Sequence, residues 1–423
     1  MKYRSKFYSL TDSLRSHVEQ HSIIEVMVVT AYLFWSNPEA TISATQRGEK
    51  ALQNHFFEAF MQHELERYFD KESYRRLTLG EIFSFYLKLY EDFGKSKEQF
   101  SIVVAEWIFA ADIKEQFESV DPGSSSQLMS EIAKLYGEGL VYDGAMGLGR
   151  LLYLLNPERF IGKEIMAHTA YLSRLLFTML GREGDIQIED ALLTEESSYQ
   201  ADIVVSQPPL SMRLKPGINY DEKPYLLITG KVPSSRGDSL WIQESLYQVK
   251  EEGRVILQLP PGWFFRGGYD QALRQALIDR NWIETIIYLP QGLLNHTGIN
   301  TNILILNKSK ESATIRLIDT RELGRKGKLG KTYFTEEEVE EIVSLIESKK
   351  VGQYDFVKDV ELLEIVKQEY NLDGNQYFSE ELEIETLNIE KELKLLEKMF
   401  DEQQRKQQAF IKQIPYFIKN KGH

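Results

Sequence analysis

The segment 202–210 brings together side chains that could do chemistry at the end of a strand. The β-branched run 203–205 predicts a short buried strand, and the polar Gln207 follows it closely. Pro208 and Pro209 come next, and since proline cannot donate to a sheet ladder, the strand must end there. Open α/β sheets hold their ligands beyond the carboxyl ends of their strands. The sequence therefore predicts a rigid polar tip inside a ligand site.

A second segment of this kind contains Asp143, Gly147 and Gly149. These residues follow the predicted strand 140–143 and precede the apolar stretch 151–155. Glycines at a strand-to-helix turn let the backbone approach a ligand, and the helix N-terminus beyond them carries partial positive charge. Taken alone, this Gly-x-Gly pattern is only a weak indication of a nucleotide-like ligand.

Two further predicted strands end in acidic residues. The run 159–164 ends at Glu164, and the run 185–190 ends at Asp190. An acid at the tip of the second strand is where ribose hydroxyls are bound in such folds. Both acids also have structural interpretations, Glu164 as a solvated strand end and Asp190 as a cap for the next segment. Polar groups on four successive strand tips form a more specific pattern than any one of them.

The tip resembles the catalytic loop of DNA amino-methyltransferases, which reads Asn or Asp, then Pro-Pro, then an aromatic residue. Here the first and last of these positions are Gln207 and Leu210. Downstream, the segments 253–268 and 369–378 and above all the run 283–308 resemble the methylation (M) subunit of type I restriction-modification systems. That family consists of DNA adenine-N6 methyltransferases, and the resemblance covers about 120 to 380.

The resemblance implies a class I methyltransferase fold, which binds S-adenosylmethionine across the carboxyl edge of its sheet. By this resemblance, Asp143, Gly147 and Gly149 hold the amino acid part of the cofactor. Glu164 binds the ribose hydroxyls, and Asp190 binds the adenine amino group.

The resemblance also implies that Gln207, Pro208, Pro209 and Leu210 are the catalytic residues. An exocyclic adenine amine is a poor nucleophile, and two carbonyl groups that accept its protons direct its lone pair toward the methyl group. The base must leave the duplex stack, where an aromatic side chain would hold it. Gln207 is one methylene longer than the usual residue, Leu210 has no π-face, and a shifted register would give Ser206 the polar role. This chemistry needs no metal, and the histidines show no ligand spacing.

The elements that must position these residues fall into three predicted parts. Residues 1–120 have apolar side chains at helical spacings and form a helical N-terminal domain. Residues 121–375 form the methyltransferase domain, where strands and helices alternate and predict a doubly wound, mostly parallel α/β sheet. The turn-rich stretch 120–126 marks the boundary between them. Residues 376–423 form a C-terminal helical extension.

That extension has apolar and amide side chains at alternating four- and three-residue intervals, a spacing typical of a heptad seam. Such a seam either folds back as a hairpin or docks on a partner, and the resemblance implies a specificity (S) subunit. The seam consists of Ile389, Leu393, Leu396, Phe400, Gln403, Gln407, Phe410 and Ile414.

The composition narrows the class of protein. A formal net charge of −14 argues against a chain that grips DNA phosphates over much of its own surface, so a partner must supply much of the positive charge. The absence of cysteine excludes disulfides and thiolate metal sites. No apolar run is long enough to span a bilayer, and the N-terminus lacks a signal-peptide core. We expect a cytoplasmic protein with no membrane contact.

Three hypotheses follow. The first is an active modification subunit that methylates DNA together with an S subunit and possibly a nuclease (R) subunit. The alternative is a catalytically weakened or inactive methyltransferase-fold paralogue that acts as a scaffold or regulator. The third is a methyltransferase that acts on RNA or protein, because a Gln-Pro-Pro tip is not diagnostic of DNA.

Overall fold

The computed structural model consists of two compact units, residues 1–377 and residues 378–423. It describes residues 4–14, 22–110, 124–195, 198–294, 300–326, 332–348, 354–378, 398–400 and 402–407.

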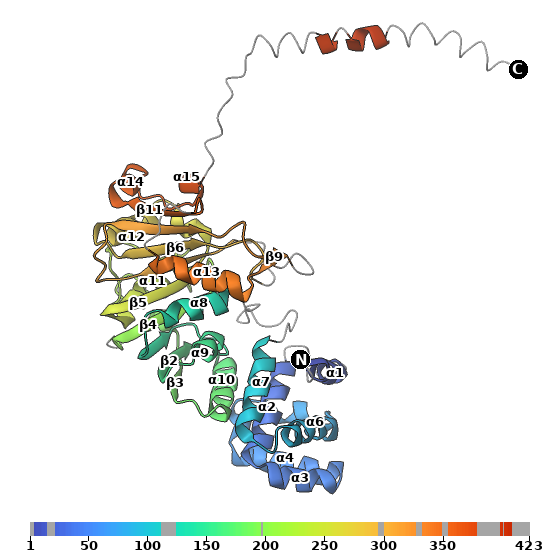
Figure 1. The fold of residues 1–423 in the computed structure, drawn as a ribbon. Helices are drawn as coiled ribbons and strands as arrows, with labels where there is room; N and C mark the ends of the chain where they lie inside the picture. The colour runs from blue at the N-terminus through green and yellow to red at the C-terminus, as the bar shows by residue number, and fades with distance from the viewer. Residues whose placement is uncertain are drawn as a thin grey trace, which may run out of the picture. The chain divides into compact units, whose positions relative to one another are not determined.

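Helices build the first part of the larger unit (Figure 1). Aromatic side chains dominate their shared core, where the ring centroids of Phe34 and Tyr86 lie 5.2 and 5.6 Å from that of Phe100. This core also takes in Leu172 and Leu176 of α10 (Ala167–Met179), a helix of the sheet region. The helices are α1 (Arg4–Leu14), α2 (Ser22–Ser36), α3 (Pro38–Gln46), α4 (Glu49–Gln62), α5 (Lys71–Tyr74), α6 (Leu79–Asp92) and α7 (Lys97–Ala110).

A nine-stranded sheet forms the centre of the second part, in the order β11-β8-β6-β7-β5-β4-β1-β2-β3. Most neighbouring strands run parallel, whereas β7 is antiparallel to β5 and β6, and β11 is antiparallel to β8. The strands are β1 (Leu140–Asp143), β2 (Arg159–Glu164), β3 (Gly184–Ile188), β4 (Ala201–Ser206), β5 (Val249–Leu259), β6 (Ile283–Tyr288), β7 (Asn302–Leu306), β8 (Thr314–Asp319) and β11 (Val357–Glu361).

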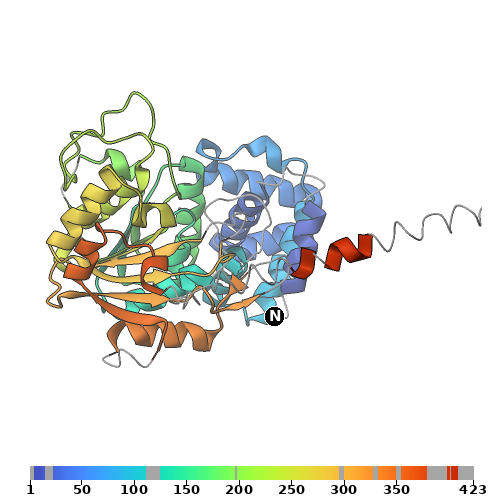
Figure 2. The same ribbon diagram turned by 90° about the horizontal axis from the view of Figure 1, so that it is seen from above.

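Helices cover both faces of this sheet (Figure 2). α8 (Ser124–Lys134), α9 (Arg150–Leu155), α10 and α13 (Glu336–Glu347) share one apolar core with the strands. α11 (Gly237–Gln248) packs on β4 and β5, and α12 (Tyr269–Asp279) packs on α11. The sheet order reverses direction between β1 and β4, so the carboxyl ends of these two strands flank the topological switch point where such sheets bind ligands.

The predicted α/β class is confirmed, and β1, β2 and β4 have the bounds that the stretches 140–143, 159–164 and 201–206 predict. The stretch 239–253 predicts one helix with a strand from 253, but α11 ends at Gln248 and β5 begins at the next residue. Strands β8 and β11 were not predicted. Arg316 explains part of this, since it puts a charge inside β8 that pairs with Asp359 on β11, 2.8 Å away.

The smaller unit is helical at 398–400 and 402–407. Of the predicted heptad seam, Phe400, Gln403 and Gln407 lie in these helical turns, and the other members lie outside the described residues. Among the residues that the structure describes, no helix has the length and apolar character needed to cross a membrane.

Candidate active site

The tips of β1, β2 and β4 meet at one edge of the sheet. The Ser206 hydroxyl, at the end of β4, donates to Asp143 Oδ1 at the end of β1, at 2.6 Å. The Gly147 amide, in the loop after β1, donates to Glu164 Oε2 at the end of β2, at 3.0 Å. The structure thus brings together the residues that the sequence predicted for this edge.

The acids at the tips of three successive strands, β1, β2 and β3, form the same kind of local hydrogen bond. At each, a carboxylate accepts a hydrogen bond from the backbone amide two residues further along, which fixes the side chain against its own loop. The pairs are Asp143 with Ala145 at 3.0 Å, Glu164 with Met166 at 2.7 Å, and Asp190 with Leu192 at 3.2 Å. The capping interpretation of Asp190 therefore describes its main-chain contact correctly.

Gly147 and Gly149 have different tasks in the loop after β1. Both adopt positive φ, 54° and 87°, which a side chain would make costly. A Cβ atom at Gly149 would lie 2.5 Å from the ring of Phe177 in α10. Gly149 is thus required for helix packing, whereas Gly147 presents its amide to Glu164.

Two buried carboxyls lie at and beneath this loop. Burial raises the pKa of Asp143 to about 7, although the Ser206 hydroxyl and the Ala145 amide act in the opposite direction. Burial likewise raises the pKa of Glu244 in α11 to about 7, although hydrogen bonds, first of all that from Tyr142, oppose it. Tyr142 donates to Glu244 Oε1 at 2.6 Å. Among the residues that the structure describes, none forms a hydrogen bond with Glu244 Oε2.

The residues at this edge fit S-adenosylmethionine. Glu164 accepts one amide on each oxygen, and a carboxylate can accept about four hydrogen bonds, so ribose hydroxyls can be added. Burial raises its pKa as well. Apolar side chains flank the acids and suit the faces of an adenine ring: Ile165, Met166 and Ile188 are 49%, 60% and 39% exposed.

Asp190 has a second partner at the adenine end. Its Oδ2 pairs with Lys215 Nζ at 2.9 Å, and that lysine is about half exposed. Surface ion pairs of this kind contribute only about 0–1 kcal/mol, so the pair does not prevent Asp190 from taking a further donor.

The Gln207 side chain is turned toward the protein interior. Its Oε1 accepts from the Ser126 hydroxyl at 2.9 Å, and its Nε2 donates to Ser125 Oγ at 3.3 Å and to Gln258 Oε1 at 2.6 Å. Gln258 in turn donates to Thr301 Oγ1 at 2.7 Å. These partners are buried, and they come from α8, from β5 and from the residue directly before β7. The Gln207 amide is therefore held directly by two separate elements, α8 and β5, and Thr301 holds Gln258 in turn.

The other three residues of the tip differ in their exposure to solvent. Pro208 is buried, Leu210 is half-buried and Pro209 is exposed. Ser211 follows with φ of 53°, in the left-handed region that non-glycine residues rarely adopt. Strain of this kind is concentrated at functional sites, and the surrounding structure must hold it in place.

Sequence reasoning missed the partners of Gln207. Gln258 gave a signal, because it is a polar residue in the otherwise apolar run 255–259, and its register beside β4 places it next to Gln207. Ser125 and Ser126 gave no such signal, since they belong to a turn-rich stretch. Two parts of the predicted pattern lie outside the described residues: 120–123 of the turn-rich boundary and 295–299 of the run 283–308 that resembles the family.

Comparison with known families decides the relationship. Residues 106–386, more than half of the chain, match the family model described as N-6 DNA Methylase. The chain belongs to this family. Every residue of the predicted site lies within the matched region of the N-6 DNA methylase family.

Relatives with known names agree with this assignment. The chain is 29% identical over 302 residues to the type I restriction enzyme MpnII methylase subunit of Mycoplasma pneumoniae, covering 63% of this chain and 54% of the relative. It is 27% identical over 328 residues to the MjaVII methylase subunit of Methanocaldococcus jannaschii, covering 73% of this chain and 52% of the relative. The chain thus spans about half the length of these relatives.

Solved structures support the fold. The type I restriction-modification methyltransferase subunit from Streptococcus thermophilus superposes with a TM-score of 0.71 at 19% identity, covering 88% of this chain and 98% of that one. A class I S-adenosylmethionine-dependent methyltransferase from Listeria monocytogenes gives a TM-score of 0.50 at 16% identity, covering 76% and 98%. The class I methyltransferase fold is therefore established.

Proposed function

We propose that the chain is the modification subunit of a type I-like restriction-modification system and transfers a methyl group from S-adenosylmethionine to N6 of a flipped-out adenine in DNA. One observation carries the proposal: Ser206, directly before Gln207, donates to Asp143 at 2.6 Å. The polar tip and the acid expected to hold the cofactor are thus one hydrogen bond apart. The family match does not favour the alternative of a non-catalytic scaffold.

The residues of the cofactor edge would bind and orient the methyl donor, S-adenosylmethionine, which supplies an electrophilic methyl group when bound. Asp143 and the loop that contains Gly147 and Gly149 would hold its amino acid part, with the two glycines giving this loop its shape rather than its donors. Glu164 binds the ribose hydroxyls, and Asp190 binds the adenine amino group beside the apolar side chains at this edge. Proximity and orientation of this kind account for a large share of the rate in two-substrate reactions.

The tip would bind the target base. Gln207 Oε1 accepts from the Ser126 hydroxyl in the free protein and would use its second lone pair for one proton of the adenine amine. A backbone carbonyl of the Pro208-Pro209 pair would accept the other proton, which makes the nitrogen more nucleophilic. The double proline fixes the direction of that carbonyl. Leu210 contacts the base through apolar surface in place of an aromatic stack, which is worth about 1–3 kcal/mol where it is present.

The proposal is tested by methyl transfer from tritiated S-adenosylmethionine to unmethylated DNA, with a co-expressed specificity subunit present. We expect N6-methyladenine in the DNA by mass spectrometry and none above background with Gln207→Ala. Transfer of the labelled methyl group to RNA or protein instead of DNA would show that DNA is the wrong substrate. Equal incorporation by wild type and Gln207→Ala would contradict it.

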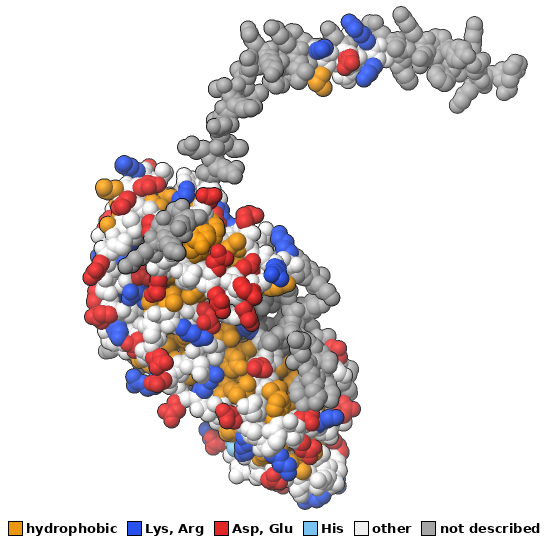
Figure 3. All heavy atoms as spheres, viewed as in Figure 1, with side chains coloured by type: hydrophobic (Ala, Val, Ile, Leu, Met, Phe, Trp, Pro, Cys, Tyr) orange, Lys and Arg blue, Asp and Glu red, His pale blue; other side chains and the backbone are white. Residues whose placement is uncertain are grey.

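We further propose that the segment 376–423 docks on an S subunit, and that an R subunit joins the complex. On the face shown in Figure 3, acidic and basic side chains are interspersed rather than gathered in one basic patch, so a partner would supply much of the positive charge toward DNA. Phe400, on the seam, is 63% exposed. Phe400→Asp should weaken co-purification with the S subunit, and Met399→Asp, 61% exposed but off the seam, should not. In a cell without a nucleus, as in the bacterial and archaeal relatives, a subunit that methylates DNA would act in the cytoplasm.

A further inference from the structure

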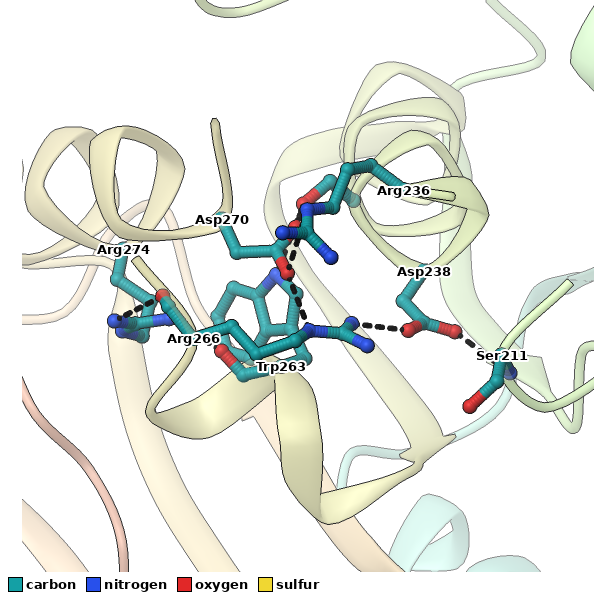
Figure 4. A network of polar contacts seen from close by, with 8 residues as sticks. Ser211, Arg236, Asp238, Trp263, Arg266, Asp270 and Arg274 are labelled. Atoms are coloured by element: carbon teal, nitrogen blue, oxygen red, sulfur yellow. Dashed lines mark hydrogen bonds and ion pairs between the residues drawn. The ribbon is translucent and has the colours of Figure 1, made fainter. Parts of the chain in front are cut away.

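The loop that follows the catalytic tip is held by a buried ionic network (Figure 4). Ser211, directly after Leu210, donates its backbone amide to Asp238 Oδ1 at 3.1 Å. Asp238 stands in the first turn of α11 and is only 2% exposed. A hydrogen bond to a buried carboxylate is charge-assisted and stronger than one between neutral groups. The backbone is thus anchored at the residue whose φ of 53° is unfavourable.

Asp238 is itself held in place. Arg266 donates from its Nη2 to Asp238 Oδ2 at 2.7 Å and from its Nε to Asp270 Oδ2 at 2.8 Å. A planar guanidinium can join two carboxylates in this way, whereas a lysine offers a single charged centre. Arg236 Nε lies 3.5 Å from the same Asp270 oxygen. The network therefore spans the start of α11, the segment after β5 and the start of α12.

The far side of the network is fixed by buried groups. Asp270 is fully buried and accepts from the Ser239 hydroxyl at 2.7 Å, which in turn accepts from Trp263 Nε1 at 3.1 Å. Arg274, 1% exposed, donates to the backbone carbonyls of Trp263, Arg266 and Tyr370. None of these groups is needed for the chemistry proposed above. Together these contacts hold Arg266 in place, and Arg266 in turn holds Asp238.

The loop also packs closely on the start of α11. A Cβ atom at Gly237 would lie 2.6 Å from the backbone oxygen of Met212. Only glycine therefore lets the backbone after the tip approach the helix that carries Asp238. The anchor and the close packing act on adjacent residues, Ser211 and Met212.

We propose that Asp238, held by Arg266, is a positioning residue that keeps Ser211 in its left-handed conformation and thereby sets the Pro208–Leu210 tip for methyl transfer. This inference rests on the proposed function. Releasing Ser211 would let its φ return to negative values, which would turn the chain directly after the tip. A displacement of about 1 Å at a reacting centre can cost about 10²-fold in rate.

The first test is kinetic. Asp238→Ala should lower kcat by about 10²-fold while the Kd of the cofactor stays within about twofold. Asp202→Ala is the matched control, because Asp202 lies at the other end of β4, where it accepts the Leu140 amide at 2.7 Å and pairs with Lys250. It should leave kcat unchanged. An equal fall in kcat for both variants would overturn the proposal.

The second test separates positioning from general stability. Glycine adopts positive φ without a steric cost. The double variant Asp238→Ala with Ser211→Gly should therefore have a kcat about tenfold higher than Asp238→Ala alone. Because glycine also relieves strain in the folded state at this φ, the free energy of unfolding is measured for each variant, and kcat is compared where each variant is fully folded. Ser211→Val, at an exposed position, should lower kcat without disturbing the network, and it serves if Asp238→Ala does not fold. Absence of both effects would overturn the proposal.

The third test does not depend on activity. Hydrogen exchange of the peptide 208–214 should be faster in Asp238→Ala by about tenfold or more, with the loop 143–149 unchanged. If wild type transfers no methyl group but this peptide is deprotected as expected, the proposed function fails and the anchoring stands. Unchanged exchange would overturn the anchoring whatever the activity.

Discussion

The cofactor edge and the catalytic tip lie side by side, but they are built by different means. At the cofactor edge, three acids accept amides only two residues away in the sequence. At the tip, the Gln207 amide is held by Ser126 and Gln258, which are 81 and 51 residues away, and the next loop is held by Asp238 and Arg266. Each acid of the cofactor edge thus has a local anchor in its own loop besides the contacts that join the strands, Ser206 with Asp143 and Gly147 with Glu164, whereas these contacts of the tip are all distant. We expect substitutions to separate cofactor binding from methyl transfer.

The largest effect is expected at Gln258. Gln258→Leu should lower methyl transfer by about 10²-fold at saturating cofactor, because it leaves Gln207 Nε2 and Thr301 without this partner and lets the amide turn. The Kd of the cofactor should not change. Gln258→Glu keeps an acceptor for Gln207 and should lose much less. Full activity in Gln258→Leu would show that the tip does not need its distant partners.

A smaller effect is expected at Glu164, which belongs to the cofactor edge. Glu164→Ala should weaken cofactor binding by about tenfold, the loss expected for one or two hydrogen bonds to a charged group. At saturating cofactor its kcat should equal that of wild type, because the tip is untouched. Asp185→Ala, exposed near the start of β3, is the control and should bind normally. Calorimetry measures both, and a fall in kcat for Glu164→Ala would argue against separable sites.

Cofactor affinity should also depend on pH. With a pKa of about 7, Asp143 carries its proton below that pH and is ionised above it. The ionised form attracts the ammonium group of the cofactor, so affinity should rise about tenfold between pH 6 and pH 8, in step with the ionised fraction of Asp143. The sign is opposite for folding: because the pKa of Asp143 is raised above that of the unfolded chain, its contribution to stability is fully present below about pH 4 and is lost as the pH rises through 7. Asp143→Asn should flatten the binding profile, and an equally steep profile in that variant would assign the dependence to another group.

The smallest effect is expected away from both regions. Thr335 and Glu338 form a capping box at the start of α13, with hydrogen bonds of 3.2 and 2.7 Å. Thr335→Ala should lower the free energy of unfolding by about 1 kcal/mol without changing cofactor affinity or kcat. This variant shows how much loss of folding stability cofactor binding and methyl transfer can tolerate. A fall in kcat at this position would mean that stability alone explains the larger effects.

The same local-versus-distant difference decides what could be predicted from the sequence. β1, β2 and β4 were predicted with their bounds because each is an apolar run that ends in a polar tip, and the acids at these tips follow from that pattern. β8 was missed because Arg316 breaks the continuous apolar run that marks strands such as β7, and its partner Asp359 is 43 residues away. The partners of Gln207 and Ser211 were missed for the same reason. A contact between residues far apart in the sequence forms only when the sheet assembles, so no local sequence pattern predicts it.

The most direct test of the account compares Gln207→Ala with wild type in two assays on the same preparation. Calorimetry measures cofactor binding, and single-turnover transfer to DNA measures methylation in the presence of the specificity subunit. We predict an unchanged Kd for the cofactor and a loss of transfer of about 10²-fold or more, as for removal of one preorganised polar group from an active site. Wild-type transfer by Gln207→Ala, or loss of cofactor binding together with transfer, would contradict the account.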